Sequence, residues 1–260
     1  MAVTALRVAR RPRDFVGVVG PDAAAYLQAM VSNDVEALAV GDACEALLLT
    51  PKARVIAPLV VLRRGVGDFL LLTESGLGVS VRSTLVRSRF AAKCDIEWEE
   101  HTSVVAFGPS EGIPTVDFGV PATEVLDEAL EPTIADDELE LMRIRAGTPR
   151  FGREIDDRVL PAEAGLEARA IDFEKGCYPG QEPIARQHYR GRVNRTLRRL
   201  EIGARELPHD DAELTYDGKV VGRITSAARD GDTVAALGYV RTEVPADAIL
   251  RLGERAVRSA

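Results

Sequence analysis

The most chemically distinctive stretch of the chain runs from Lys175 to Glu182 and reads Lys-Gly-Cys-Tyr-Pro-Gly-Gln-Glu. Pro179-Gly180 suits the centre of a type II turn, and Pro183 suits the first turn of a short helix that follows. Cys177 is therefore expected near a turn and a helix N-terminus, with Lys175 on the same side of an extended segment. A nearby ammonium group and a helix dipole both favour a thiolate, which is a nucleophile or a metal ligand.

The cysteine pattern limits the metal chemistry that the chain can perform. Three cysteines and three histidines are present, without a Cys-x-x-Cys pair or a Cys/His cluster. A structural zinc or an iron–sulfur cluster needs about four convergent ligands, so no resident metal is expected. Widely spaced free thiols indicate a reducing, cytoplasmic location. Cys44 and Cys94 are expected to be structural, and Cys177 has the same alternative because free cysteines are often buried apolar side chains.

Length and composition indicate a soluble protein of two or three small domains. The chain has 260 residues, of which 46% are apolar and 28% charged, a balance typical of globular proteins. The net charge is −8, from 33 basic and 41 acidic residues, which argues against a protein that mainly coats nucleic acid. No apolar run approaches the roughly 20 residues of a membrane span, and Arg7, Arg10, Arg11 and Arg13 argue against a secretion signal.

Apolar periodicity predicts a mixed α+β fold in the first part of the chain. The expected helices are 23–31, 78–90 and 136–146, and the expected strands are 16–19, 44–50, 54–62, 69–73, 95–99 and 103–107. Asp22 is the expected N-cap of the first helix. Residues 108–135 are rich in Gly, Pro and acidic side chains and are expected to be connecting structure. The order of elements lacks the regular alternation of a doubly wound sheet.

The last part of the chain has a different pattern. Residues 148–195 contain few apolar runs and are expected to form an ordered, functional loop system with a short helix near 183–189. From residue 196 onward the pattern is all-β. Asp217-Gly218 predicts a tight hairpin, because this pair supplies the positive φ angles of a type I′ turn. About five or six short strands in this region predict a small barrel or Greek-key domain.

Several motifs resemble those of the YgfZ-type folate-binding proteins, which are relatives of the glycine-cleavage T-protein (aminomethyltransferase). The octapeptide 175–182 resembles the signature Lys-Gly-Cys-[Phe/Tyr]-x-Gly-Gln-Glu of that family. The other similar blocks, which follow the family's order, are 20–35, 143–147, 149–154, 161–166, 222–227 and 236–241. The resemblance therefore covers most of the chain.

The resemblance implies a fold, a ligand and a role. The implied fold is an α+β, three-domain cloverleaf around a folate-sized channel, with a C-terminal small β-barrel. The expected domains are residues 1–45 together with 105–190, an inserted domain at 46–104, and the barrel at 196–260. The implied ligand is tetrahydrofolate. The implied role is support of iron–sulfur cluster assembly or repair, with client or assembly proteins as partners.

The resemblance also implies which residues form the folate site. Glu163 matches a family glutamate that meets the pterin ring, and a carboxylate complements the adjacent N–H and amino groups of a pterin edge. The alternative is that Glu163 only begins a surface turn. Asn33, Arg186, Tyr178 and Gln181 are expected to line the same channel.

The T-protein branch differs from this chain at two positions where that branch carries acidic residues. That branch carries an Asp pair where Ala57 and Pro58 stand here, and neither of these side chains can move a proton. Aminomethyl transfer is therefore disfavoured, and any catalysis is expected from Cys177, with Lys175 tuning its thiol. Two alternative functions remain: a tetrahydrofolate-dependent one-carbon transferase with another substrate, and an interaction scaffold whose folate channel is vestigial.

A basic run follows the octapeptide. Six arginines lie between Arg186 and Arg199, and no acidic residue occurs from 183 to 200. Guanidinium groups suit carboxylates and phosphates, so the glutamate tail of a folate is one candidate partner. The backbone of tRNA is another, since tRNA-modifying roles have been proposed within the family. The third interpretation is a solvated helix face and strand edge.

Overall fold

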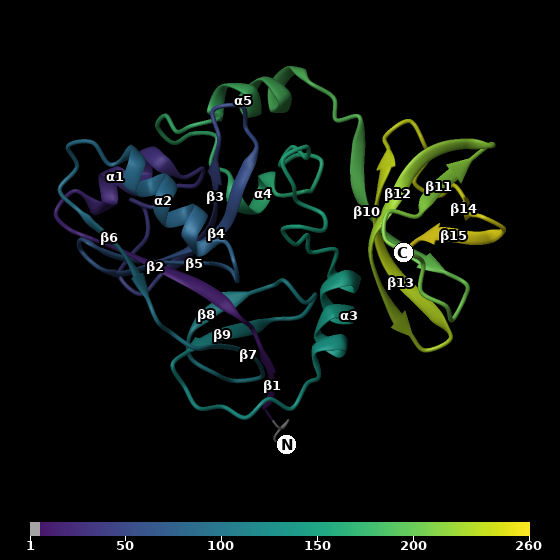
Figure 1. Cartoon of the computed structure of the whole chain (residues 1–260), viewed down its shortest axis with the longest axis horizontal. Helices are drawn as coiled ribbons and strands as arrows, with labels where there is room; N and C mark the ends of the chain where they lie inside the picture. The colour runs from purple at the N-terminus through teal and green to yellow at the C-terminus, as the bar shows by residue number, and fades with distance from the viewer. Residues whose placement is uncertain (1–5) are drawn as a thin grey trace.

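The computed structural model describes residues 6–260, which form two α+β units and a β-barrel around a central segment (Figure 1). The helices are α1 (Ala23–Met30), α2 (Gly78–Ser88), α3 (Asp136–Ala146), α4 (Glu167–Ala170) and α5 (Gln181–Arg190). Four of them match the predicted ranges closely, and α4 lies within the predicted loop system. Over the described residues, no helix has the length and apolar character needed to cross a membrane.

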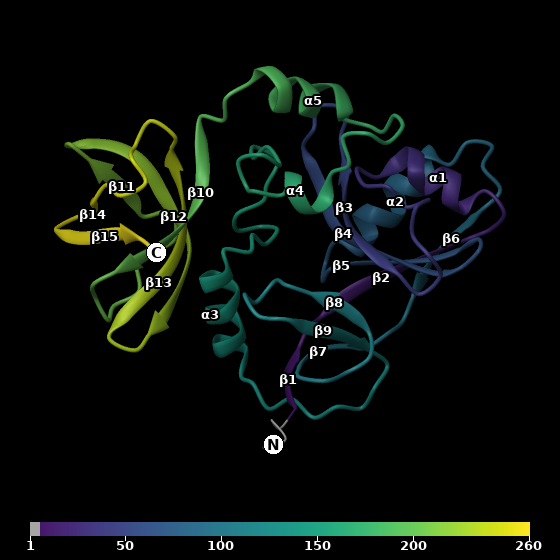
Figure 2. The same cartoon turned by 180° about the vertical axis from the view of Figure 1, so that it is seen from behind.

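A five-stranded antiparallel sheet in the order β3-β4-β5-β2-β6 forms the first unit. Its strands are β2 (Arg13–Val19), β3 (Ala43–Leu49), β4 (Val55–Gly65), β5 (Asp68–Glu74) and β6 (Asp95–Glu99). Helices α1 and α2 cover one face, where Leu27 and Leu85 are fully buried among sheet residues that include Ala57 (Figures 1 and 2). Because side chains alternate along a strand, Pro58 lies on the opposite face of β4.

Asp22 precedes α1, as predicted, but it does not cap the helix with its side chain. One carboxylate oxygen instead accepts the backbone N–H of Lys93 at 2.8 Å. The predicted capping interaction is therefore wrong, because the carboxylate of Asp22 accepts a hydrogen bond from Lys93, which is distant in the sequence.

A four-stranded sheet in the order β1-β7-β9-β8 forms the second unit, and α3 packs beside it. Its strands are β1 (Arg7–Arg10), β7 (Ser103–Phe107), β8 (Ile113–Thr115) and β9 (Ala122–Leu126). The prediction that residues 108–135 are only connecting structure is therefore wrong. Gly112 has φ +144°. Pro114 is tolerated because β8 is an edge strand. Two short strands therefore form in a region whose composition is typical of turns.

The sheets also divide the chain differently from the expected domains. Strand β2 pairs with β5 in the register Phe15↔Leu72, so residues on both sides of position 45 share one sheet. Strand β1 instead pairs with β7, in the register Arg7↔Phe107. The discontinuous unit is thus 7–10 with 103–146, and position 45 is not a domain boundary.

The C-terminal unit is a closed barrel in the order β10-β13-β12-β11-β14-β15, which confirms the predicted barrel. Its strands are β10 (Arg195–Ile202), β11 (Glu213–Tyr216), β12 (Lys219–Asp230), β13 (Thr233–Arg241), β14 (Leu250–Leu252) and β15 (Arg255–Ser259). Asp217 and Gly218 have φ +49° and +74°, as the predicted type I′ turn requires. The local sequence alone therefore specifies the β11–β12 hairpin.

A buried polar cluster holds the barrel against α3. Arg143 Nη1 donates to Glu154 Oε2 at 3.1 Å, and Arg143 Nη2 donates to Ser226 Oγ at 2.9 Å. Ser226 Oγ donates in turn to Glu154 Oε1 at 2.6 Å. Glu154 is fully buried, and its backbone oxygen accepts the hydroxyl of Tyr239 at 2.9 Å. These groups satisfy one another where water does not reach, so they fix β12 and β13 to α3.

Replacing Glu154 with Ala tests this cluster. The change leaves the buried guanidinium of Arg143 without one of its carboxylate partners, so we expect a loss of about 3–5 kcal/mol of unfolding free energy, measured by urea denaturation. Glu138→Ala is the matched control, because Glu138 forms an exposed ion pair with Arg7 and its loss should cost less than about 1 kcal/mol. Equal losses in the two variants would contradict the role of the cluster.

Candidate functional site

A cavity of about 900 Å³ lies where the two α+β units meet the barrel. This volume falls within the range of about 300–1,000 Å³ that is common for small-molecule sites. Its apolar surfaces include Pro58, Phe118, Leu139, Phe151 and Leu166. The charged residues that line it are Arg10, Arg11, Arg13, Glu45, Glu74, Asp117, Asp136, Glu140, Arg143, Arg150, Arg153 and Arg169. We call this space the central cavity; its wall combines apolar patches with fixed charges.

Many of these charges are paired within the protein. Asp117 contacts both Arg11 and Arg169, and Arg169 Nη2 also donates to Glu45 Oε1 at 2.5 Å. Burial alone would raise the pKa of Asp117, but the two guanidinium groups lower it to about 2. These side chains therefore form a rigid wall, and little of their charge is available to a ligand.

Glu74, at the end of β5, differs from these paired charges because no cationic side chain forms an ion pair with it in the described part of the chain. One carboxylate oxygen, Oε1, accepts the backbone N–H of Phe151 at 2.9 Å, which fixes the orientation of the group. Within residues 6–260, Glu74 is the half-buried carboxylate of this wall that has no ion-pair partner. Burial raises its pKa. Glu74 is therefore a fixed hydrogen-bond acceptor with capacity left for a ligand.

Asn33 does not line the central cavity but supports its wall from behind. Its Nδ2 donates to the backbone oxygen of Glu45 at 2.7 Å and to that of Arg169 at 3.3 Å. Both of these residues line the cavity. The structure thus gives Asn33 a positioning role.

Cys177 lies in the loop before α5, and its side chain is exposed. The predicted turn is present, since Gly180 has φ +87° and the N–H of Gln181 donates to the oxygen of Tyr178 at 3.2 Å. The alternative that Cys177 is a buried apolar side chain is therefore wrong. The thiol does not line the central cavity. It is exposed to solvent on the surface of the loop, where a partner molecule can reach it.

Lys175 points away from that surface. Its Nζ donates to the backbone oxygens of Gln28, Val31 and Asn33 at 2.7, 2.6 and 2.8 Å. These are all the donors that an ammonium group has, so none is left for the sulfur of Cys177. Burial lowers the pKa of Lys175 to about 8. Lys175 therefore fixes the loop to the C-terminal end of α1, where a helix dipole favours a cation.

Three more predicted residues lie around the same loop and outside the cavity wall. Tyr178 is buried, which raises its pKa to about 12, and the Nζ of Lys175 lies 5.3 Å from its ring centre. Gln181 begins α5. Arg186 is exposed and donates to Glu182 Oε1 at 2.8 Å. The structure thus gathers Lys175, Tyr178 and Gln181 near Cys177 and leaves Arg186 on the outer face of α5.

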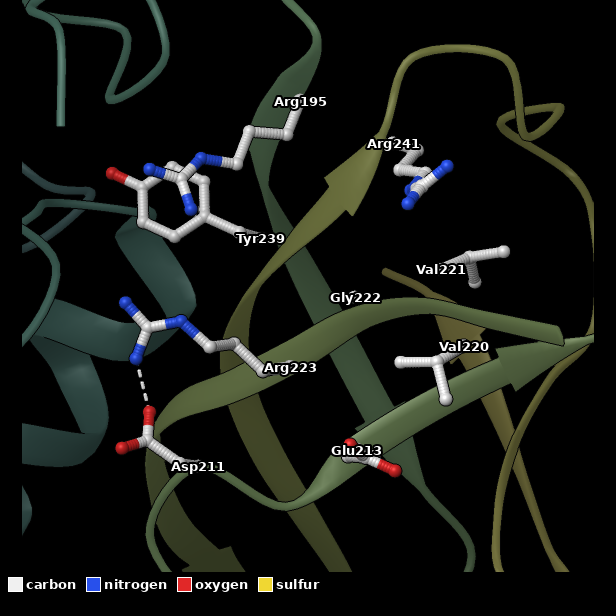
Figure 3. A pocket seen from close by; sticks show the side chains of 9 residues that line it. All are labelled: Arg195, Asp211, Glu213, Val220, Val221, Gly222, Arg223, Tyr239 and Arg241. Atoms are coloured by element: carbon white, nitrogen blue, oxygen red, sulfur yellow. Dashed lines mark hydrogen bonds and ion pairs between the residues drawn. The ribbon is translucent and has the colours of Figure 1, made fainter. Parts of the chain in front are cut away.

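Glu163 faces the barrel instead of the central cavity. Its Oε2 accepts a hydrogen bond from Arg195 Nη2 at 3.2 Å and from the backbone N–H of Leu160 at the same distance. Arg195 also stacks 4.9 Å from the ring centre of Tyr239 and lines a second cavity of about 310 Å³ on the barrel (Figure 3). The expected folate ligands are therefore not brought together in one cavity.

Several curated proteins that are similar to this chain carry the name tRNA-modifying protein YgfZ. The tRNA-modifying protein YgfZ of Edwardsiella ictaluri is 28% identical over 93% of this chain and 86% of that protein. Its counterpart from Serratia proteamaculans is 27% identical, over 91% and 84%. An uncharacterized protein of Haemophilus influenzae is 28% identical, over 82% and 80%. No family model matches the chain.

A solved structure supports the same relationship. The glycine cleavage system aminomethyltransferase T of Bartonella henselae matches with a TM-score of 0.83 and 19% identity, over 97% of this chain and 84% of that one. The chain is thus similar to YgfZ-type proteins over most of its length. The aminomethyltransferase-like fold that the resemblance implies is confirmed by this structural match.

Ala57 and Pro58 occupy the positions where the resemblance places the Asp pair of the T-protein branch. The Ala57 side chain is buried in the core beneath α1 and α2. Pro58 lines the central cavity. Neither side chain can transfer a proton, so this part of the wall contributes shape only.

Proposed function

We propose that the chain binds a reduced folate, tetrahydrofolate or a one-carbon derivative of it, in the central cavity. The observation that carries this proposal is Glu74, a fixed acceptor without an ion pair in a cavity of suitable volume. The aminomethyltransferase-like fold supports the assignment. The family resemblance of the sequence motifs points to the same ligand.

The two ends of a folate fit different parts of this wall. A pterin edge presents an N–H and an amino group side by side, and the carboxylate of Glu74 complements both. Phe118 and Phe151 supply apolar surface for the rings. The glutamate tail carries negative charge and suits Arg10, which is exposed and forms no ion pair in the described part of the chain. We assign pterin recognition to Glu74 rather than to Glu163, because Arg195 occupies the latter.

The proposed role of the folate-bound protein is support of iron–sulfur cluster assembly or repair. Cys177 is the group proposed to act on client or assembly proteins, as a nucleophile or as a transient metal ligand. Its exposure supports this proposal, because an exposed thiol can reach a partner protein.

A tetrahydrofolate-dependent one-carbon transferase is the second candidate. Burial raises the pKa of Glu74, which brings this carboxyl closer to the range where it can exchange a proton during a reaction. Turnover of formaldehyde equivalents on tetrahydrofolate by the wild-type chain, with loss in Glu74→Gln, would favour this candidate. Absence of turnover in the wild type would exclude it.

Calorimetric titration with folinic acid tests the proposed site. Wild type is expected to bind, and Glu74→Gln is expected to bind roughly 10- to 100-fold more weakly, because a hydrogen bond to a charged group contributes about 1.5–3 kcal/mol. Binding by wild type should also weaken as the pH falls through the raised pKa of Glu74, since protonation removes the anionic acceptor. Glu74→Gln should lack this pH dependence.

Glu163→Gln is the matched control for that titration. It should keep wild-type affinity, because Glu163 lies outside the central cavity. Weakening in Glu163→Gln but not in Glu74→Gln would move the pterin toward the barrel. Absence of binding by the wild type would refute the folate proposal itself.

Replacing Cys177 with Ala tests the role of the thiol. Cells in which this variant is the only copy should lose activity of iron–sulfur enzymes, because the exposed sulfur is the proposed reacting group. Cys44→Ala is the control; burial raises the pKa of that thiol to about 12, so it should be inert. Wild-type enzyme activities in the Cys177→Ala strain would show that the thiol has no such role.

A further inference from the structure

A second cavity, of about 310 Å³, lies on the barrel and is separate from the central cavity. Its lining comes from β10, β11, β12 and β13 and from the loop residue Asp211, and none of these lining residues belongs to the central cavity. A volume of this size is at the lower end of the range of about 300–1,000 Å³ for small-molecule sites. We call this space the barrel cavity, and its size suits a small ligand.

An irregularity in the strand pairing shapes the barrel cavity. The register of β11 against β12 shifts in the middle of the pair, and the consecutive residues Val220 and Val221 both line the cavity. In a regular strand, consecutive side chains point to opposite faces, and a β-bulge changes this direction. At the next position, Gly222, a Cβ atom would lie 2.1 Å from the backbone oxygen of Tyr239. Two valines therefore form an apolar strip beside a position that has no side chain.

Two groups of opposite charge lie at the ends of this apolar strip. Figure 3 shows, in order along one side of the barrel cavity, Arg241, Val221, Val220 and Glu213. Arg241 is the last residue of β13, and Glu213 is the first residue of β11. A guanidinium group, two apolar side chains and a carboxylate therefore follow one another on the same wall.

The carboxylate of Glu213 is available to a ligand. Glu213 is exposed, and within residues 6–260 its side chain forms no ion pair and accepts no hydrogen bond. Arg223 lies directly opposite Glu213 in the pairing of β11 with β12, but its guanidinium contacts Asp211 instead (Figure 3). An ammonium group of a ligand would donate hydrogen bonds to the unused carboxylate of Glu213.

Arg241 lies beside another positive charge that its own contacts compensate only weakly. It is directly opposite Arg195 in the pairing of β10 with β13, and like charges at such positions are destabilising. Arg195 is compensated by the carboxylate of Glu163 at 3.2 Å. In the described part of the chain, Arg241 pairs with Glu243 at 3.4 Å, and both side chains are exposed, so this pair contributes little. A ligand carboxylate would pair with the guanidinium of Arg241 and reduce the repulsion.

We propose that the barrel cavity binds a small zwitterion that carries a carboxylate at one end of a short aliphatic chain and an ammonium group at the other. The carboxylate pairs with Arg241, the methylene groups lie against Val221 and Val220, and the ammonium group donates to Glu213. Such a ligand matches the charge at both ends of the strip. A dianion would meet the carboxylate of Glu213, and a diamine would meet the guanidinium of Arg241, so both are disfavoured.

Calorimetric titration with ε-aminocaproate tests the proposal. Wild type should bind it, and should bind caproate and n-hexylamine at least about tenfold more weakly, because each of these lacks one of the two charged groups. Arg241→Gln and Glu213→Gln should each bind ε-aminocaproate roughly tenfold more weakly than the wild type, because each removes one charged partner.

The two variants should also lose selectivity at opposite ends of the ligand. Arg241→Gln should bind ε-aminocaproate and n-hexylamine alike, because the carboxylate has lost its partner. Glu213→Gln should bind ε-aminocaproate and caproate alike, because the ammonium group has lost its partner. A merely structural role of either side chain would not produce this reciprocal pattern.

Arg258→Gln is the matched control, because Arg258 is an exposed arginine of β15 outside the barrel cavity. It should bind ε-aminocaproate like the wild type, and thermal melting should show that every variant is folded. Three results would each overturn the proposal: no binding of ε-aminocaproate by the wild type, equal binding of caproate or n-hexylamine by the wild type, or unchanged binding in both cavity variants. Folinic acid titration of Arg241→Gln should match the wild type, which keeps this test independent of the folate proposal.

Discussion

A charge that is removed from water must find a partner inside the protein, and this constraint organises the centre of the molecule. Arg143 and Glu154 satisfy this requirement by pairing with each other, and the hydroxyl of Ser226 in the barrel forms hydrogen bonds with both. Asp117 and Arg169 meet it in the wall of the central cavity. Ser226 and Asp117 each lie more than fifty residues along the chain from the charged groups that they contact. The same contacts therefore hold the three units together and shape the space between them.

Within such a wall, a carboxylate that lacks a counter-ion stands out. Glu74 is held by a backbone N–H and has spare acceptor capacity, so a ligand with adjacent N–H donors would satisfy it. The exposed thiol of Cys177 lies outside this cavity. The proposed folate site and the thiol are therefore separate parts of the molecule.

Local features of the fold could be predicted from the sequence, because neighbouring residues determine them. The periodic apolar residues of α1, α2 and α3 and the Asp217-Gly218 turn are examples. Strands β8 and β9 could not be predicted, since their stability comes from pairing with β7 rather than from their own composition. The family motifs led to the correct fold, but they did not reveal where individual side chains point.

In the candidate site, too, the sequence did not reveal where individual side chains point. Lys175 sits two residues from Cys177, yet its ammonium group is held by carbonyl oxygens of the α1 end. Glu163 has the right chemistry for a pterin, but its carboxylate accepts a hydrogen bond from Arg195 and does not line the central cavity. The arginines of the cavity wall come from segments more than a hundred residues apart, so only the folded chain brings Arg11 and Arg169 to one carboxylate.

The most direct measurement is a crystal structure of the chain grown with folinic acid. Our account predicts a pterin ring in the central cavity, with its N–H and amino groups within hydrogen-bonding distance of the Glu74 carboxylate. A pterin bound on the barrel beside Arg195, or a central cavity that stays without ligand at saturating folinic acid, would contradict it.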